Sequence, residues 1–458
     1  MRKIISILLL AACVLGLGAC GADKGEGGES SSSYELHTSI PGLDEPRGGR
    51  VLTIAGLGAS NLDMYALEFN NDPERDFTVK FVDYQPTGID WDTAAARLKA
   101  DLAAGKAPDM IDFDAFPSQD IYARQGLLRD MSDYFYDEFE LDEFYTLDVL
   151  NPTGALYFFP ANFQIITAYG SPKIFAGKSA WSISDYEQLS RLPQFAESPA
   201  DTQESFLSKL HEYMIPAWVD LQQGVCRYDD GSFADALRFA ATLGIEPLNY
   251  AGKRAAMVGS GQLLYSETWI RSPLDIKTIE KAMGSPASFI GVPTPDGSFG
   301  SSILTFGLVG VNAATENADL AWEFIRYMMT EGRFVHDEKM WDNIPVLKVA
   351  AEEKMAFDLN PYAEFAGKTI VINDDGTFEA DGVHQDMTYD PSPVITEEQA
   401  KAFYQLIERT THVYAQDSAA YEIMMDCARQ YLAGDKSLED TVTNAQSRTG
   451  IYLAEQCG

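Results

Sequence analysis

Basic residues are scarce in this chain. Its 458 residues include 69 Asp and Glu but only 34 Lys and Arg, which gives a formal net charge of −35 at pH 7. A charge of this size repels phosphate backbones and anionic lipid headgroups. We therefore expect neither nucleic acid nor an anionic membrane surface as a partner. A small anionic solute is not excluded, because a local pocket can override the field of the whole molecule.

Histidine and cysteine are also few, with five of each. No C-x-x-C motif and no pair of histidines at metal-ligand spacing occurs, so we expect no metal centre and no cofactor. Residues 373–382 partly resemble a calcium loop but lack its closing Glu, and a hairpin turn on Asp375-Gly376 is expected instead. A disulfide between Cys427 and Cys457 and a set of free thiols that includes Cys226 are both compatible with the sequence.

The sequence lacks the motifs of common catalytic sites. It contains no G-x-S-x-G, no metal-ligand pair and no Cys/His arrangement. The run from Gly56 to Asn61 follows an apolar stretch but lacks the third glycine of a dinucleotide-binding loop. With 69 carboxylates, a pair at glycosidase spacing is expected by chance and carries no information. We therefore expect a protein that binds a ligand, not an enzyme.

A long apolar run occurs at the N-terminus. Ile4 to Leu17 follows Arg2-Lys3 and is too short to span a bilayer with confidence. Leu17-Gly18-Ala19-Cys20 resembles the bacterial lipobox, which predicts a signal peptide over residues 1–19 and a lipid on Cys20. The alternative is a plain secretory signal with an incidental cysteine. Residues 20–48 are polar and rich in Gly and Ser, which predicts a flexible tether.

Two lobes are expected, because 458 residues exceed what one hydrophobic core usually supports. Residues 51–55, 77–84 and 110–114 have the pattern of strands that alternate with helices, which predicts a right-handed parallel sheet. Asp114 and Phe116 come at the end of the third strand and just after it, where ligands of open α/β sheets bind. An ordinary helix–strand unit without a binding site would show the same spacing.

Three stretches carry a resemblance to a known family. They are LKADLAAGKAPDMIDFD with YARQGLLRDMSDY, the segment from Phe289 to Asn312, and YLAGDKSLEDTVTNAQSRTGIYLAEQ near the C-terminus. Together they resemble the extracellular solute-binding proteins of ABC importers, and more narrowly the carbohydrate-binding branch that is similar to maltose-binding protein. The matches run from Val51 to Gln456 in the family's order, which single motifs could not imitate.

The resemblance implies an α/β fold of two lobes with a ligand cleft between them and multiple hinge crossovers. Lobe one would comprise residues 49–155 plus 305–335, and lobe two residues 156–304 plus 336–458. The implied function is capture of a sugar or oligosaccharide and its delivery to an ABC permease, by a monomer anchored through lipid to the outer face of the cytoplasmic membrane. The alternatives are a surface lipoprotein that binds or senses glycans and a lipid-anchored enzyme that acts on glycans.

Sugars have apolar faces and hydroxylated rims, so their sites combine aromatic platforms with charged or amide acceptors. The strand end from Ser266 to Trp269 offers an acid and a tryptophan together, although Trp269 would equally suit a core position. Trp218 and Trp322 lie on apolar helix faces and are expected to pack in the core. From the strand ends and the resemblance, the predicted ligand-binding residues are Asn61, Tyr65, Asp114, Phe116, Asn162, Tyr169, Glu267, Trp269 and Trp341.

Overall fold

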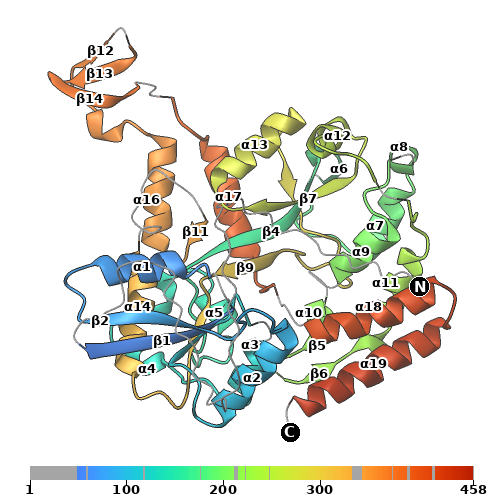
Figure 1. The fold of residues 1–458 in the computed structure, drawn as a ribbon. Coiled ribbons are helices and arrows are strands. Elements are labelled where there is room, and N and C mark those ends of the chain that lie inside the picture. Colours follow the sequence, from blue (N-terminus) through green and yellow to red (C-terminus); the bar gives the residue numbers. More distant parts are fainter. Residues whose placement is uncertain are drawn as a thin grey trace, which may run out of the picture. The chain divides into compact units, whose positions relative to one another are not determined.

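The computed structural model, drawn in Figure 1, describes residues 49–456 apart from 58–59, 117–118, 176, 197, 211–214, 222, 247, 333–342, 374, 389–391 and 415–417. The predicted signal peptide, the predicted tether and three residues that the sequence singles out lie outside the described residues. These three are Cys20, Trp341 and Cys457.

The first sheet contains four strands in the order β10-β3-β1-β2. Its three parallel strands are connected by two helices, as the alternating pattern predicted, and its fourth strand joins antiparallel. The elements are β1 (Arg50–Gly56), α1 (Asp63–Asn71), β2 (Phe77–Asp83), α2 (Trp91–Ala103), β3 (Met110–Asp112) and β10 (Val309–Val311).

Local chemistry explains how α2 leads into β3. The side chain of Asp90 caps the helix by accepting a hydrogen bond from the N–H of Thr93 at 2.9 Å. Gly105 takes a left-handed φ of +66° just after the helix, which a residue with a Cβ adopts at a cost. The following strand ends at Asp112, two residues earlier than predicted, so Asp114 lies in the turn beyond it.

The second sheet is built around one long, fully buried strand, β4 (Asn162–Gly170). Every neighbour pairs with β4 antiparallel: two on one side and two on the other. These neighbours are β7 (Tyr265–Ile270), β8 (Ser288–Phe289), β9 (Ser302–Phe306) and β11 (Ile344–Pro345).

The chain passes between the two sheets several times. Phe159 forms a β-bridge with Val309 beside the first sheet, and three residues later β4 begins in the second. The return path runs from β9 through Gly307 into β10. A third passage lies between α14 (Ala318–Thr330) and β11. Multiple crossovers were predicted and are present, whereas the exact lobe boundaries stay predictions.

The remaining helices and strands surround these sheets. Their bounds are α3 (Gln119–Arg124), α4 (Ser132–Tyr136), η2 (Leu141–Glu143), α5 (Leu147–Leu150), α6 (Pro172–Phe175), α7 (Ile183–Ser190), α8 (Pro193–Ala196), α9 (Gln203–Lys209), α10 (Ile215–Trp218), β5 (Val219–Asp220), β6 (Val225–Cys226), η4 (Tyr228–Asp230), α11 (Ser232–Ala240), α12 (Arg254–Ser260), α13 (Pro273–Met283), α16 (Lys348–Leu359), η5 (Ala363–Phe365), β12 (Ile370–Ile372), β13 (Thr377–Ala380), β14 (Val383–Thr388), α17 (Glu397–Arg409), α18 (Ser418–Leu432) and α19 (Leu438–Glu455).

The hairpin turn predicted on Asp375-Gly376 is confirmed. β12 and β13 form an antiparallel hairpin, in whose turn Gly376 has a φ of +87° and Asp375 Oδ1 accepts from the N–H of Thr377. The last two helices, α18 and α19, lie side by side (Figure 1), and Ser437 caps α19 by accepting from the N–H of Asp440 at 3.0 Å. The thiols of Cys226 and Cys427 are free.

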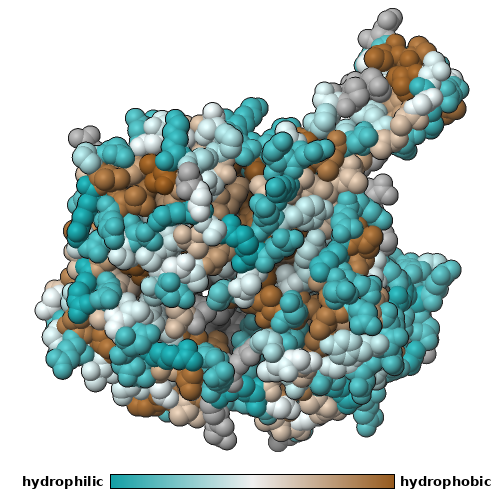
Figure 2. Space-filling model, turned by 180° about the vertical axis from the view of Figure 1, so that it is seen from behind, coloured by the Kyte–Doolittle hydropathy of each residue, from teal (hydrophilic) through white to brown (hydrophobic). Residues whose placement is uncertain are grey.

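The largest fully buried side chains are aromatic. Trp218 and Trp322 are buried, as predicted. Trp181, Tyr186 and Tyr265 form a mutually contacting group with ring centroids 5.2–5.4 Å apart. Hydrophilic residues cover much of the face shown in Figure 2, in keeping with the high net charge. Among the described residues, no helix is both long and apolar enough to cross a membrane.

Candidate functional site

One face of the ladder formed by β4 and β7 gathers polar and aromatic side chains. Side chains alternate along a strand, so Asn162 and Gln164 share a face of β4 with Ile166 and Ala168. Paired residues of antiparallel strands lie on the same face, and Trp269 pairs with Ile166 while Glu267 pairs with Ala168. We call the group Asn162, Gln164, Glu267 and Trp269 the ladder face. Measured along β4 from Asn162 to Ala168, it extends over seven residues, or about 20 Å.

Trp269 is the open end of the ladder face. Its side chain is 60% exposed, although tryptophan usually buries most of its surface. Glu267, two residues earlier, is half-buried, with 32% of its side chain exposed. An accessible indole beside a carboxylate offers both the apolar platform and the charged acceptor that were predicted from the strand end.

Amides occupy the other end of the ladder face. Asn162 Nδ2 donates to Tyr65 Oη at 3.0 Å, and Asn343 Nδ2 donates to Asn162 Oδ1 at 2.8 Å. Gln164 Nε2 donates in turn to Asn343 Oδ1. The remaining oxygen of Gln164 is buried and has no hydrogen-bond partner among the described residues. A buried acceptor without a donor is costly, and a ligand hydroxyl is the kind of group that would satisfy it.

Carboxylates at the end of β3 hold the neighbouring loops together. Asp114 Oδ2 accepts from Asn61 Nδ2 at 2.8 Å and from the N–H of Gly307 at 2.7 Å, and its other oxygen accepts from the N–H of Leu308 at 3.2 Å. Asp112 accepts a hydrogen bond from Ser60 Oγ. Burial raises the pKa of Asp114, and burial together with the charge of Asp114 raises the pKa of Asp112 to about 7.

A charged pocket of about 510 Å³ lies beside β7. Lys209 Nζ pairs with the buried carboxylate of Asp201, donates to Tyr265 Oη at 2.9 Å and lies 2.7 Å from Glu267 Oε1. Burial alone would raise the pKa of Asp201. The pKa is nevertheless below its ordinary value, because the carboxylate is next to the charge of Lys209 and accepts hydrogen bonds from Lys209, Tyr265 and Tyr186. Arg254 Nε donates to Ser266 Oγ at 3.1 Å on the same pocket wall.

The predicted site residues separate into two groups. Phe116 is fully buried against Tyr84, with ring centroids 6.2 Å apart, and Tyr169 is buried with its ring 6.4 Å from that of Phe289. These two rings lie in the core, so in this structure they offer no surface to a ligand, contrary to the expectation. Tyr65 is buried too and reaches the ladder face through its hydroxyl. The rest of the described set, which is Asn61, Asp114, Asn162, Glu267 and Trp269, lies at the strand ends or on the ladder face.

Sequence reasoning missed Gln164, Asp201, Lys209 and Asn343. A lysine within the apolar run FLSKL was the available signal for Lys209, because a buried lysine needs a carboxylate partner. The partner itself could not be found from spacing. Gln164 shares the face of Asn162 by simple alternation, which could have identified it. Among the described residues, no cluster of acids, histidines and cysteines suits a metal ion.

The comparisons with known proteins agree with this architecture. The family described as "Bacterial extracellular solute-binding protein" matches residues 66–361, which is more than half of the chain. The chain belongs to this family. No curated protein matches this solute-binding protein in sequence.

Solved structures with the same fold cover almost all of the described chain. A periplasmic oligogalacturonide-binding protein from Yersinia enterocolitica is 13% identical, with a TM-score of 0.54, over 89% of this chain and 100% of the other. The sugar-binding protein MalE from Xanthomonas citri is 13% identical, with a TM-score of 0.53, over 88% and 98%. A de novo designed esterase is 11% identical, with a TM-score of 0.52, over 89% and 100%. The predicted two-lobed solute-binding fold is confirmed.

Proposed function

We propose that this solute-binding protein captures a sugar or oligosaccharide on the ladder face and delivers it to an ABC permease. The observation that carries the proposal is the placement of exposed Trp269 on the same face as Glu267 and the unsatisfied acceptor of Gln164. A sugar ring can stack on the indole while its hydroxyls reach the acceptors. The similar structures include an oligogalacturonide-binding protein and a sugar-binding protein, which supports the same class of solute.

The site is better suited to ligand capture than to catalysis. Both strand-end carboxylates hold neighbouring loops: Asp112 accepts from Ser60 Oγ, and Asp114 accepts from Asn61 and from two backbone N–H groups. The likeness to a designed esterase, at 11% identity, concerns the fold alone. A surface glycan-binding or sensing role would use the same ladder face and differ only in the partner that receives the signal.

The site is tested by calorimetric titration of a sugar panel into the wild type and Trp269→Ala. We expect one sugar to bind, and the substitution to weaken that binding at least about tenfold, since a stacked aromatic contributes on the order of 1.5 kcal/mol or more. The melting temperature without sugar should hardly change, because the side chain is mostly exposed. Tyr136→Ala removes another exposed aromatic and should leave binding unchanged. Equal affinity in the wild type and Trp269→Ala would reject the ladder face as the site.

Anchoring through Cys20 is part of the proposal and is supported by the lipobox-like Leu17 to Cys20. Cys20→Ala should move the protein from the membrane fraction to the medium or periplasm, or block its maturation. Immunoblots of fractionated cells give the answer. Normal maturation with unchanged membrane retention would contradict the lipid anchor.

A further inference from the structure

A buried ammonium group lies next to the ladder face. Lys209 is the last residue of α9, and only 4% of its surface is exposed. Its Nζ pairs with Asp201 Oδ1, donates to Tyr265 Oη at 2.9 Å and lies 2.7 Å from Glu267 Oε1. An ammonium has three N–H donors, which these three oxygens match. Lys209 can therefore act on a solute only through a residue that it contacts.

Asp201 balances the charge of Lys209 and holds the ammonium in place. Its carboxylate is fully buried and accepts from Tyr186 Oη at 2.7 Å and from Tyr265 Oη. Buried charges persist in proteins where they are both paired and hydrogen-bonded, as they are here. Because one carboxylate is enough to balance one ammonium, Glu267 leaves a net negative charge beside the pair.

The two oxygens of Glu267 have different surroundings. Oε1 is buried and faces the ammonium of Lys209. The side chain as a whole is 32% exposed, so the exposure belongs to its other atoms. Among the described residues, no hydrogen bond occupies Oε2. Oε2 is therefore the oxygen that a solute hydroxyl can reach, on the same face as Trp269.

Fixing Oε1 prepares the carboxylate of Glu267 for binding. A glutamate side chain that is free to rotate loses conformational entropy when a ligand orders it, whereas one that an ion pair already holds loses less. A hydrogen bond to an ionised acceptor is also stronger than one to a neutral acceptor. Both effects favour a solute that presents a hydroxyl donor to Oε2.

We propose that Lys209 is a positioning residue for sugar capture, which keeps Glu267 fixed and ionised so that Oε2 accepts from a sugar hydroxyl. Asp201 completes the arrangement, because without it Glu267 would have to balance the ammonium. The inference rests on the proposed function, since Glu267 belongs to the ladder face. A purely structural ion pair would stabilise the fold equally well, but its loss would not depend on Glu267.

Calorimetric titration of the full chain with glucose, galactose, maltotriose and cellotriose tests the proposal, and the sugar that binds most tightly becomes the probe. Lys209→Met combined with Asp201→Asn removes both charges of the pair, because removing one alone would leave a buried charge unpaired. We expect this double variant to bind the probe sugar about tenfold more weakly. Melting curves should show an intact fold, because neutral side chains of similar volume often replace a buried ion pair without loss of stability.

Asp201→Asn alone provides a second probe that keeps Lys209 paired with one carboxylate. Glu267 would then balance the ammonium, so its oxygens would be weaker acceptors. The probe sugar should bind about threefold more weakly or worse, which corresponds to part of one charged hydrogen bond. Wild-type affinity in this variant would contradict the role of Asp201.

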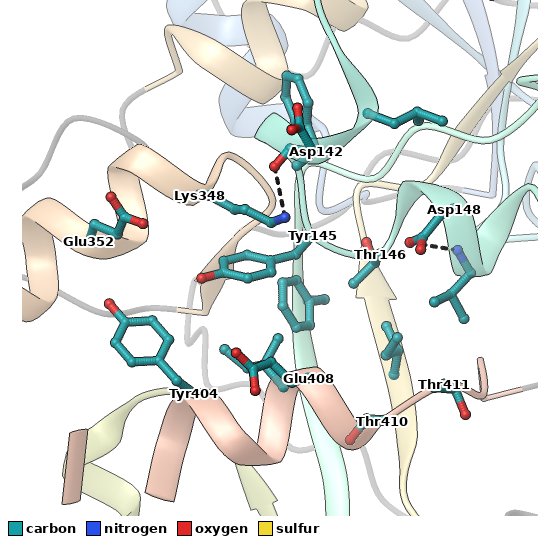
Figure 3. A pocket seen from close by; sticks show the side chains of 16 residues that line it. Asp142, Tyr145, Thr146, Asp148, Lys348, Glu352, Tyr404, Glu408, Thr410 and Thr411 are labelled. Carbon is teal, nitrogen blue, oxygen red and sulfur yellow. Dashed lines mark hydrogen bonds between the residues drawn. The ribbon is translucent and has the colours of Figure 1, made fainter. Parts of the chain in front are cut away.

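Lys348 offers a matched control. It too lies against a tyrosine ring, 5.4 Å from the centroid of Tyr145, where Lys209 lies 4.8 Å from that of Tyr265. Lys348 lines another pocket, of about 730 Å³, and donates to the backbone oxygen of Asp142 at 2.7 Å, as the dashed line in Figure 3 shows. Lys348→Met makes the same substitution away from Glu267 and should bind the probe sugar like the wild type.

Glu267→Gln supplies the decisive comparison. If Lys209 acts through Glu267, the double variant weakens binding only where the glutamate is present. The triple variant should therefore bind the probe sugar no more weakly than Glu267→Gln alone. Losses that multiply, full affinity in the double variant, or an equal loss in Lys348→Met would each overturn the assignment. If none of the four sugars binds, sugar capture itself is contradicted and the inference falls with it.

Discussion

At the scale of the residue, Asp112 is the most informative acid. Its carboxyl group is buried at the end of β3 next to Asp114, and its pKa is raised to about 7, whereas an unfolded chain would give it about 3.9. The folded state therefore binds this proton more tightly than the unfolded state. The associated stability is fully present below the unfolded pKa and is lost as the pH rises through about 7.

We predict that Asp112→Asn removes part of this pH dependence. The amide imitates the protonated acid and can still accept from Ser60, so the melting temperature should match the wild type at a pH below about 3.9, where the acid is protonated in both the folded and the unfolded chain. Near pH 8 it should exceed that of the wild type, on the order of 2 °C or more. Scanning calorimetry at the two pH values measures both. If the difference in melting temperature between the variant and the wild type is the same at both pH values, the raised pKa of Asp112 is contradicted.

At the scale of the element, the passage from β9 to β10 depends on Gly307. This residue has a φ of +63°, and a Cβ built on it would lie 2.9 Å from the Cβ of Ala161. Its N–H also donates to Asp114, so the passage is fixed by one carboxylate and by the absence of one side chain.

We predict that Gly307→Ala lowers stability by about 1–2 kcal/mol from the left-handed conformation alone, and by more from the contact with Ala161. Gly367→Ala is the matched control, because Gly367 has a φ of +82° and no atom within 4 Å of the added Cβ. Denaturant unfolding of both variants compares them directly. If the two variants lose the same stability, the close approach at Gly307 has no energetic effect.

Elements were easier to predict from the sequence than the site. The helix before Gly105 and the strand after it follow from local capping, turn chemistry and apolar periodicity. Asp114 lies in the turn two residues beyond the strand end, close to where it was predicted, but its partners Gly307 and Leu308 come from almost 200 residues away. Period-two alternation assigns Tyr169 to one face of β4 but does not say which face is covered. Only the packing of distant segments decides that.

At the scale of the whole molecule, the repeated passages between the two sheets are the feature that bears on function. Joined lobes that rotate about such passages are a common way for a protein to enclose a ligand. A solute that contacts both sides would favour the closed arrangement in proportion to its differential affinity.

We predict that a confirmed sugar reduces the radius of gyration of the protein in solution. Small-angle scattering with and without the sugar measures the change, and Trp269→Ala at the same sugar concentration should show less compaction because less of it is bound. An unchanged scattering curve at saturation would indicate a rigid binder.

The exposure of Trp269 also gives the protein an optical reporter. Trp181, Trp218 and Trp322 are buried, whereas the indole of Trp269 faces solvent and should emit at longer wavelength than these three. A soluble quencher should reach it first, and a bound sugar that covers the ring should shield it and shift its emission to the blue. The difference spectrum between the wild type and Trp269→Phe isolates this signal, so solute capture can be followed in real time without a label.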